Sequence, residues 1–208
     1  MSISAVIFDL GGVVLDSPLD VFVAYETELG IPPHTVNRNI VAAGHTGAWS
    51  RLERGELTMI EFYAAFDEEM AARGLHVSGA AIMQRLADST AIRPAAVSAI
   101  RKLRASGFKV AALTNNWAND DQGAKMEVLR AEFDAFIEST VVGLRKPDPR
   151  IYQLACARLG VEPAQAAFLD DIGLNLKAAR ALGMVTIKVA SLPEALTELS
   201  VVTGVALP

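Results

Sequence analysis

The sequence has few of the residues that build disulfides, zinc sites or membrane anchors. Its 208 residues include one cysteine and three histidines. A single cysteine excludes an internal disulfide, and so few histidines exclude a zinc site of the Cys/His type. Apolar residues never continue for the roughly 18 positions that span a bilayer. We therefore expect a cytoplasmic protein with no membrane partner.

No charge of one sign dominates the chain either. Nineteen Lys and Arg against 24 Asp and Glu give a net charge of −5 at pH 7. This balance excludes the basic surface that binds nucleic acid. Hydrophobic residues make up 51% of the chain and charged residues 21%, which excludes a mainly disordered protein. The first apolar run stops at Asp9, too early for the core of a signal peptide.

The spacing of apolar residues changes along the chain. A short β-branched and aromatic run at 5–10 is typical of a buried strand. Residues 17–90 show helical spacing with no convincing strand. From Pro94 onward, strands alternate with helices to the end of the chain. This alternation predicts an α/β fold, with a Rossmann-like parallel sheet and helices on both faces.

The change of pattern also predicts a division into two parts. We expect an α/β core domain built from 1–16 and 91–208, and an inserted, all-helical cap domain at 17–90. Helices are expected in the insert at 19–29, 35–43, 58–73 and 78–89. In the core we expect strands at 109–113, 136–139, 166–169 and 184–189, and helices at 94–107, 125–133, 149–159, 174–182 and 193–202.

Polar side chains stand at the ends of several expected strands, where open parallel sheets bind their ligands. They are Asp9, Thr114, Asn115, Lys146, Asp170 and Asp171. Each taken singly has an ordinary interpretation as a cap, a turn or a solvated charge. Because the strand ends converge at one edge of the sheet, the set together indicates a site for phosphate and a metal ion.

The same residues lie in stretches that resemble the haloacid dehalogenase-like hydrolase superfamily. The stretches are VIFDLGGVV, RLERGELT, ALTNNW, VGLRKPDPRIY and FLDDIGLNLKAARALGMVTI. They look like the N-terminal phosphatase domain of soluble epoxide hydrolase and its stand-alone bacterial relatives. The resemblance implies the fold of that superfamily, with the helical insert as a cap.

The resemblance also implies a nucleophile and a metal site. Asp9 would attack phosphorus and form an aspartyl-phosphate. Asp9 and Asp171 would hold Mg²⁺ together with the main-chain carbonyl of Gly11. Asp170 would support this metal site from behind, and Asn175 would orient the carboxylates.

Three further residues would handle the phosphate. Thr114 and the main-chain amide of Asn115 would hold its oxygens, and Lys146 would balance the charge of the acyl-phosphate. The expected activity is therefore Mg²⁺-dependent hydrolysis of a phosphomonoester, and the expected partner is a small phosphorylated metabolite. Neither the substrate nor the oligomeric state follows from the sequence.

Gly11 departs from the pattern of the family. Phosphatases of the superfamily usually carry a second Asp at this position, which protonates the departing alkoxide and then activates water. Losing a general acid and base slows a reaction by about 10²–10⁴-fold. We expect slow turnover or a preference for good leaving groups. An alternative explanation of Gly11 is a backbone shape that Asp would not adopt.

Two other functions stay open. In a carbon–halogen hydrolase, Asp9 would attack carbon and the halide would leave without a proton, so Gly11 would do no harm. Asp170 and Asp171 oppose this alternative, because carboxylates beside the nucleophile need a cation to neutralise them. The other alternative is a non-catalytic protein that binds a phosphorylated ligand.

Four more residues attract attention because of their type. His45, Trp49 and Trp117 either line a substrate pocket under the cap or pack in the ordinary way, and we favour packing. Cys156 shares a predicted helical face with Tyr152, which makes it a core residue rather than a reactive thiol.

Overall fold

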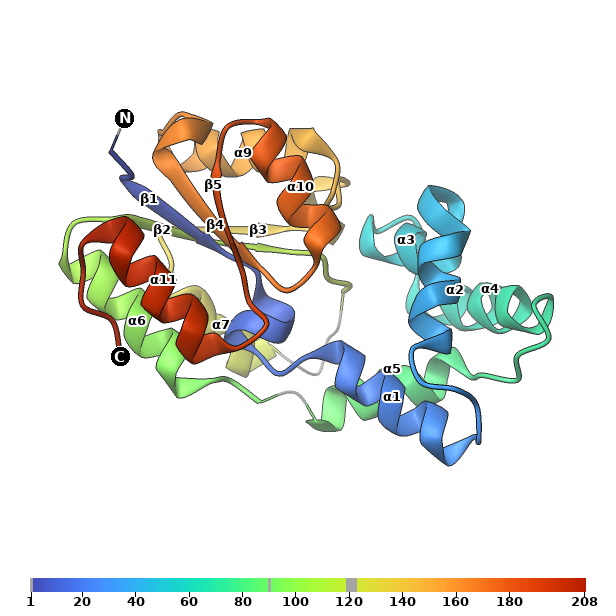
Figure 1. The fold of residues 1–208 in the computed structure, drawn as a ribbon. Coiled ribbons are helices and arrows are strands. Elements are labelled where there is room, and N and C mark those ends of the chain that lie inside the picture. The colour runs from blue at the N-terminus through green and yellow to red at the C-terminus, as the bar shows by residue number, and fades with distance from the viewer. Residues whose placement is uncertain (1, 90, 119–122) are drawn as a thin grey trace.

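The computed structural model describes residues 2–89, 91–118 and 123–208 (Figure 1). A five-stranded parallel sheet of order β3-β2-β1-β4-β5 forms its centre. The strands are β1 (Ala5–Phe8), β2 (Lys109–Thr114), β3 (Ala135–Glu138), β4 (Ala166–Asp170) and β5 (Val185–Lys188). β1 lies in the middle and pairs with both β2 and β4, so the residue that follows it emerges at the centre of the sheet edge. The predicted parallel α/β fold is confirmed.

Helices cover both faces of this sheet (Figure 1). One face carries α6 (Pro94–Ala105), α7 (Gly123–Arg130) and α11 (Leu192–Thr203). The other carries α9 (Pro149–Leu159) and α10 (Gly173–Ala181). Along β1, Val6 and Phe8 enter the first layer of core, whereas Ala5 and Ile7 enter the second. Successive side chains of a strand point to opposite faces, which is why a continuous apolar run suits a sheet covered on both sides.

Among the described residues, five α-helices stand between β1 and α6 and form a group of their own. They are α1 (Pro18–Glu28), α2 (Thr35–Ala43), α3 (Ala48–Glu53), α4 (Met59–Ala71) and α5 (Gly79–Ser89). They share a separate apolar cluster that includes Trp49, Phe62 and Phe66, and they lie beside the sheet in Figure 1. Thr58 and Glu61 form a capping box at the start of α4. The division into a core domain and a cap domain stays a prediction, and its boundary residue 90 lies outside the described residues.

Three local features differ from the predicted elements. β1 ends at Phe8 rather than at residue 10, because the chain turns into a π-helical segment at Leu10–Val14. The short helices α3 and α8 (Ser139–Val142) were not predicted.

Among the described residues, no helix is long and apolar enough to cross a membrane.

Candidate active site

The first loop of the sheet places Asp9 at the centre of the site. Asp9 follows β1 directly and is buried, with 6% of its surface exposed. Its Oδ1 accepts a hydrogen bond from the amide of Leu10 at 2.6 Å. Its Oδ2 lies 2.7 Å from the Nζ of Lys146. Both oxygens are therefore held, and the carboxylate has a fixed orientation.

Lys146 is a buried cation that joins two of the carboxylates. Its side chain is 1% exposed, and its Nζ lies 2.7 Å from Asp9 and 2.8 Å from Oδ2 of Asp170. Burial alone would lower the pKa of the Lys146 ammonium, but the charges of Asp170 and Asp9 outweigh burial and raise it. Lys146 therefore stays charged inside the protein.

Asp9, Asp170 and Asp171 bring ligand oxygens within 4.8 Å of one another. Burial raises the pKa of Asp9 well above its usual value, and the charges of Asp170 and Asp171 act in the same direction. Burial and the charge of Asp170 also raise the pKa of Asp171, to about 6. One ammonium does not balance three carboxylates. A divalent cation would, and hard carboxylate oxygens are the ligands that Mg²⁺ prefers.

Asp170 is the best held of the three carboxylates. Asn175 donates its Nδ2 to both oxygens, at 3.1 and 3.0 Å, and the amide of Ile172 donates to Oδ1 at 2.7 Å. Tyr152 in turn donates its hydroxyl to the carbonyl of Asn175 at 3.0 Å. With Lys146 added, donors occupy both oxygens of Asp170, which suits a supporting role rather than a reacting one.

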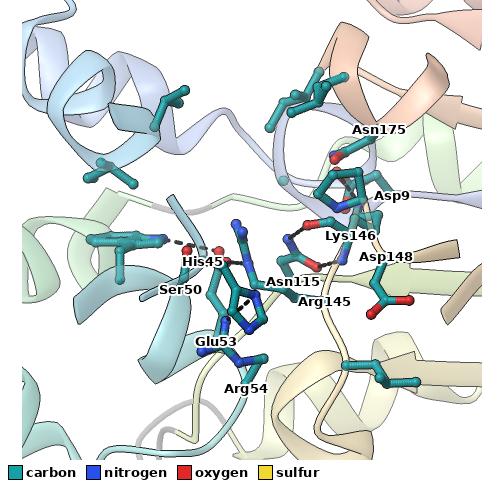
Figure 2. Close-up of a pocket in the computed structure, with 18 of the residues that line it drawn as sticks. Asp9, His45, Ser50, Glu53, Arg54, Asn115, Arg145, Lys146, Asp148 and Asn175 are labelled. Carbon is teal, nitrogen blue, oxygen red and sulfur yellow. Dashed lines mark hydrogen bonds and ion pairs between the residues drawn. The ribbon is translucent and has the colours of Figure 1, made fainter. Parts of the chain in front are cut away.

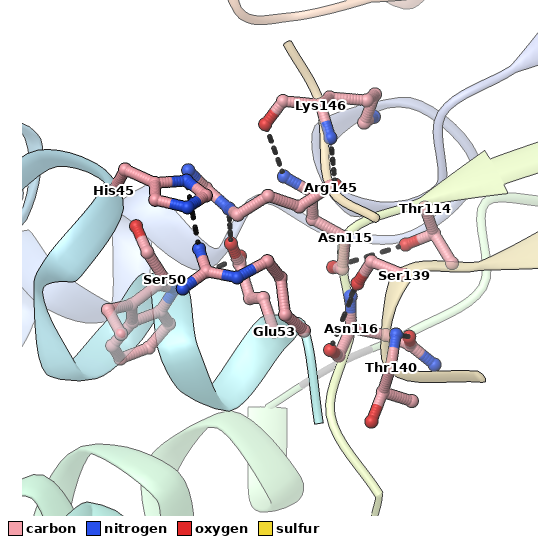
Figure 3. A network of polar contacts seen from close by, with 12 residues as sticks. His45, Ser50, Glu53, Thr114, Asn115, Asn116, Ser139, Thr140, Arg145 and Lys146 are labelled. Atoms are coloured by element: carbon pink, nitrogen blue, oxygen red, sulfur yellow. Dashed lines mark hydrogen bonds and ion pairs between the residues drawn. The ribbon is translucent and has the colours of Figure 1, made fainter. Parts of the chain in front are cut away.

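Asn115 fixes the segment that carries Lys146 (Figure 3). Its Nδ2 donates to the carbonyl of Lys146 at 3.1 Å, and its Oδ1 accepts from the amide of Lys146 at 2.8 Å. Thr114 is buried, and its hydroxyl donates to the carbonyl of Asn115 at 3.3 Å. The structure thus brings Asn115 into contact with Lys146, and Thr114 precedes Asn115 directly, at the end of β2.

A cavity of about 620 Å³ opens between this sheet edge and the helical group. Figure 2 shows Asp9, Lys146 and Asn175 on one side of it and His45 and Glu53 on the other. The cavity wall also includes Gly11, Phe22, Ile40, Trp49, Trp117, Asp171 and Ile172. A small organic molecule would fit between the polar sheet edge and the mainly apolar helices.

His45, Trp49 and Trp117 all line this cavity. Trp49 also packs edge-on against Phe22, with ring centroids 5.3 Å apart, and against Trp117 at 5.7 Å. The two tryptophans therefore line the cavity and also pack against neighbouring aromatic rings, whereas His45 is exposed. Cys156 is buried in the core, as predicted.

A family model described as haloacid dehalogenase-like hydrolase matches residues 3–183. The chain belongs to this family. The family resemblance inferred from the sequence is thereby confirmed, and the chain is a hydrolase with the family's parallel sheet.

Two longer proteins are similar to this hydrolase. Acyl-CoA dehydrogenase family member 10 of Mus musculus is 38% identical over 206 residues, which are 98% of this chain and 19% of the relative. Bifunctional epoxide hydrolase 2 of Sus scrofa is 36% identical over 222 residues, covering 100% of this chain and 40% of the relative. The hydrolase thus spans between about a fifth and two fifths of the length of these relatives.

A solved structure shows the same fold. A HAD family enzyme of Bacteroides thetaiotaomicron, in complex with magnesium and inorganic phosphate, has a TM-score of 0.61. It is 24% identical in sequence, and the match covers 90% of this chain and 94% of that one.

The backbone conformation at Gly11 contradicts the explanation that Asp would not adopt the shape of this loop. Its φ of −62° and ψ of 128° are open to any residue, so the loop shape does not exclude Asp. A Cβ at this position would lie 3.2 Å from Cγ and Cδ of Pro18, a tight contact with the edge of a ring. Gly12 is the residue with a left-handed φ, of 75°.

Sequence reasoning missed the role of Gly12 and the contacts of Arg145 in this hydrolase. A Cβ on Gly12 would lie 2.3 Å from Oδ2 of Asp171, so only glycine leaves room for that carboxylate. Arg145 donates its Nε to Oε2 of Glu53 at 2.6 Å and so links the sheet edge to α3. The only local signal for Arg145 was its place next to Lys146.

Proposed function

We propose that this hydrolase is an Mg²⁺-dependent phosphatase, which cleaves a small phosphomonoester through an aspartyl-phosphate on Asp9. The observation that carries the proposal is the set of three carboxylates within 4.8 Å, opposed by the single ammonium of Lys146. A phosphate dianion would add to this negative charge and would bind only with a cation present. Asp9, Asp171 and the carbonyl of Gly11 would hold Mg²⁺, which when bound would neutralise the phosphate oxygens.

The held geometry of Asp9 suits in-line attack on phosphorus. A carboxylate oxygen of Asp9 forms a bond to phosphorus while the bond to the leaving oxygen breaks. The leaving oxygen takes a proton from water and departs as an alcohol. The hydroxide left from that water then attacks the phosphorus of the acyl-phosphate, and the bond from phosphorus to the Asp9 oxygen breaks, which releases phosphate and restores the carboxylate. Lys146 and the amide of Leu10 keep the carboxylate oriented throughout.

Thr114 and Asn115 would bind the phosphate during these steps. The Thr114 hydroxyl lies at the carboxyl end of β2, and Asn115 lines the cavity. The hydroxyl would turn from the carbonyl of Asn115 toward a phosphate oxygen. Lys146, which the side chain of Asn115 holds, would balance the charge of the acyl-phosphate.

Gly11 favours carbon–halogen hydrolysis as a second candidate, because a halide leaves without a proton. The two functions are separated by assaying phosphate release from an aryl phosphate and halide release from a 2-haloacid, each with and without Mg²⁺. Phosphate release that depends on Mg²⁺ supports the proposal. A protein that binds inorganic phosphate with Mg²⁺ but turns over neither substrate would be a binding protein.

Leaving-group chemistry provides a prediction for Gly11. If the missing acid limits the rate, aryl phosphates are hydrolysed about 10²–10⁴-fold faster than simple alkyl phosphates, whose leaving oxygen needs a proton. Gly11→Asp is expected to narrow this gap by raising kcat on alkyl phosphates. The measurement is kcat for both substrate classes in wild type and variant.

Gly11→Asn is the matched control, since it makes the same contact with Pro18 but carries no acid. It is expected to leave the gap between aryl and alkyl phosphates as wide as in wild type. Equal rates on both classes in the wild type would show that another group supplies the proton.

Gly12→Ala is expected to displace Asp171, because the new methyl group would overlap its Oδ2. We expect Mg²⁺ affinity to fall by about tenfold or more, since a ligand carboxylate is lost. Titration with Mg²⁺ by calorimetry measures the effect.

Gly74→Ala is the matched control for backbone strain. Gly74 has the same φ of 75°, and nothing lies within 4 Å of its added Cβ. It is expected to lower Tm slightly and to leave Mg²⁺ affinity unchanged. Equal loss of Mg²⁺ affinity in both variants would contradict the role given to Gly12.

A further inference from the structure

The cavity holds a second polar cluster that the proposed reaction does not use. It consists of His45, Glu53, Arg54, Glu56 and Arg145. Figure 2 shows His45, Glu53 and Arg145 gathered away from Asp9, and Figure 3 shows the same three side chains from close by. His45, Glu53, Arg54 and Arg145 line the same cavity as the proposed nucleophile.

Arg145 offers hydrogen-bond donors to this cavity. Its Nε is bound to Oε2 of Glu53 at 2.6 Å, and Oε1 of Glu53 accepts from Nε1 of Trp49 at 3.0 Å. Glu53 is 6% exposed, so the pair anchors the guanidinium firmly. Within the part of the chain that the structure describes, the Nη1 and Nη2 groups of Arg145 have no hydrogen-bond partner. Four N–H donors are thus held at the wall of the cavity.

His45 adds one more donor. Nη1 of Arg54 lies 3.3 Å from Nδ1 of His45, and a guanidinium only donates. Nδ1 is therefore the acceptor, and the proton of the neutral imidazole lies on Nε2. Arg54 is itself held by Glu56, through Nε at 2.5 Å and Nη2 at 2.9 Å. The exposed ring of His45 is thus fixed with an N–H donor available to a ligand.

The charges of this cluster cancel. Arg145 is paired with Glu53 and Arg54 with Glu56, which also lies 3.8 Å from Arg51, a residue outside the cavity lining, and Nδ1 of His45 accepts from Arg54. At the rim of the cavity, Arg150 and Asp148 form another pair, with Nη2 and Oδ2 2.6 Å apart. Donors without net charge suit an uncharged acceptor oxygen better than a second phosphate or a carboxylate.

We propose that Arg145 and His45 form a specificity subsite, which binds a carbonyl or hydroxyl oxygen of the leaving group. The proposal rests on the phosphatase function, because it assigns the phosphate to the Asp9 end of the cavity. The substrate would then be a phosphomonoester whose alcohol carries an uncharged oxygen acceptor at a distance from the phosphate. Trp49 and the other apolar residues would contact the carbon skeleton between the two ends.

Binding of phosphonates tests the subsite without requiring turnover. The probes are benzylphosphonates with an acetamido, an isobutyl or a carboxylate group, placed at the meta and at the para position of the ring. Acetamido and isobutyl have the same number of heavy atoms, but only acetamido offers a carbonyl oxygen. Dissociation constants are measured by calorimetry in the presence of Mg²⁺, and the preference is the ratio of the isobutyl to the acetamido value.

Arg145→Met and His45→Phe are each expected to lower this preference about tenfold, the effect of one lost hydrogen bond in a shielded site. Arg150→Met is the matched control. It removes a guanidinium from the same cavity wall, but one whose Nε and Nη2 donate to Asp148. The Arg150→Met variant is expected to show the same ratio of the isobutyl to the acetamido dissociation constant as wild type.

Arg145→Met leaves the buried carboxylate of Glu53 unpaired, which weakens the fold. The double variant Arg145→Met with Glu53→Gln removes that charge and keeps an oxygen acceptor for Trp49. It is expected to show the same tenfold loss. His45→Phe touches neither residue and provides an independent measurement.

Three results would overturn the proposal. They are an unchanged preference in all Arg145 and His45 variants, a carboxylate probe that binds more tightly than the acetamido probe, and no binding of any phosphonate. Phosphate release from an aryl phosphate, whose leaving oxygen needs little protonation, is measured separately. Absence of that release, with the preference lost in the variants, would refute the phosphatase function and leave the subsite standing.

Discussion

Asp9→Asn is expected to abolish phosphate release, with kcat falling by at least about 10⁴-fold. The carboxamide has nearly the shape of the carboxylate but does not attack phosphorus. Its oxygen still accepts the hydrogen bond from the amide of Leu10, so the loop keeps its conformation. Phosphate release from an aryl phosphate in excess Mg²⁺ measures the loss. Unchanged turnover would remove Asp9 from the mechanism.

The same substitution is expected to stabilise the metal-free protein near neutral pH. Burial and two neighbouring carboxylates raise the pKa of Asp9 above its usual value of 3.8, so the folded state disfavours the ionised form. Wild-type stability then falls as the pH rises from the usual pKa through the raised one. The amide does not titrate. Tm in EDTA is therefore expected to be higher for Asp9→Asn at pH 7, with the difference shrinking toward pH 4.

Asp88→Asn provides the control for this pH dependence. Asp88 is exposed, and it accepts a hydrogen bond only from the side chain of Gln84 among the described residues. The Tm of the Asp88→Asn variant is expected to equal that of wild type at every pH. A lower Tm for Asp9→Asn at pH 7 would mean that the pairing of Asp9 with Lys146 outweighs burial and repulsion.

Much of the core could be predicted because local chemistry determines it. α9 begins with Pro149 at its first position and ends at Gly160, which adopts a left-handed φ of 68°. Both residues have strong positional preferences, and the predicted helix at 149–159 matches the observed one. The convergence of Asp9, Lys146 and Asp170 could be predicted from the parallel sheet, since its strand ends meet at one edge.

The contacts of the helical group could not be predicted in this way. Glu53 and Arg145 are 92 positions apart, and their ion pair depends on how α3 lies against the sheet edge. α3 has only six residues and no side-chain cap, so its sequence carries little helical signal. At Gly11 and Gly12 the sequence shows two neighbouring glycines, but not which of them takes the left-handed backbone. The structure assigns that conformation to Gly12.

Removal of the divalent cation is expected to silence the enzyme, with phosphate release falling by about 10³-fold in excess EDTA. Without a divalent cation, the carboxylates of Asp9, Asp170 and Asp171 would face a phosphate dianion, with Lys146 in contact with two of them and the charge of Arg93 acting on Asp171. Electrostatic repulsion would then oppose both binding and attack. Adding Mg²⁺ in excess is expected to restore the rate.

Asp171→Asn tests the same site without chelation, because it removes one charge and keeps the shape of the side chain. The concentration of Mg²⁺ that gives half-maximal phosphate release is expected to rise about tenfold or more. Asp148→Asn is the matched control. Asp148 lines the same cavity but pairs with Arg150 and caps α9, a position where Asn serves as well as Asp. Its Mg²⁺ requirement is expected to equal that of wild type.

Phosphate release that persists without a divalent cation would contradict the proposed metal site. Full phosphate release in excess EDTA would show that the basic side chains Lys146 and Arg93 suffice to offset the three carboxylates, and the proposed metal site would be wrong. Halide release from a 2-haloacid without Mg²⁺ would favour attack of Asp9 on carbon, a reaction that needs no proton donor at Gly11. Because chelation changes the two reactions differently, assays of both substrates on one preparation, with and without EDTA, decide between them.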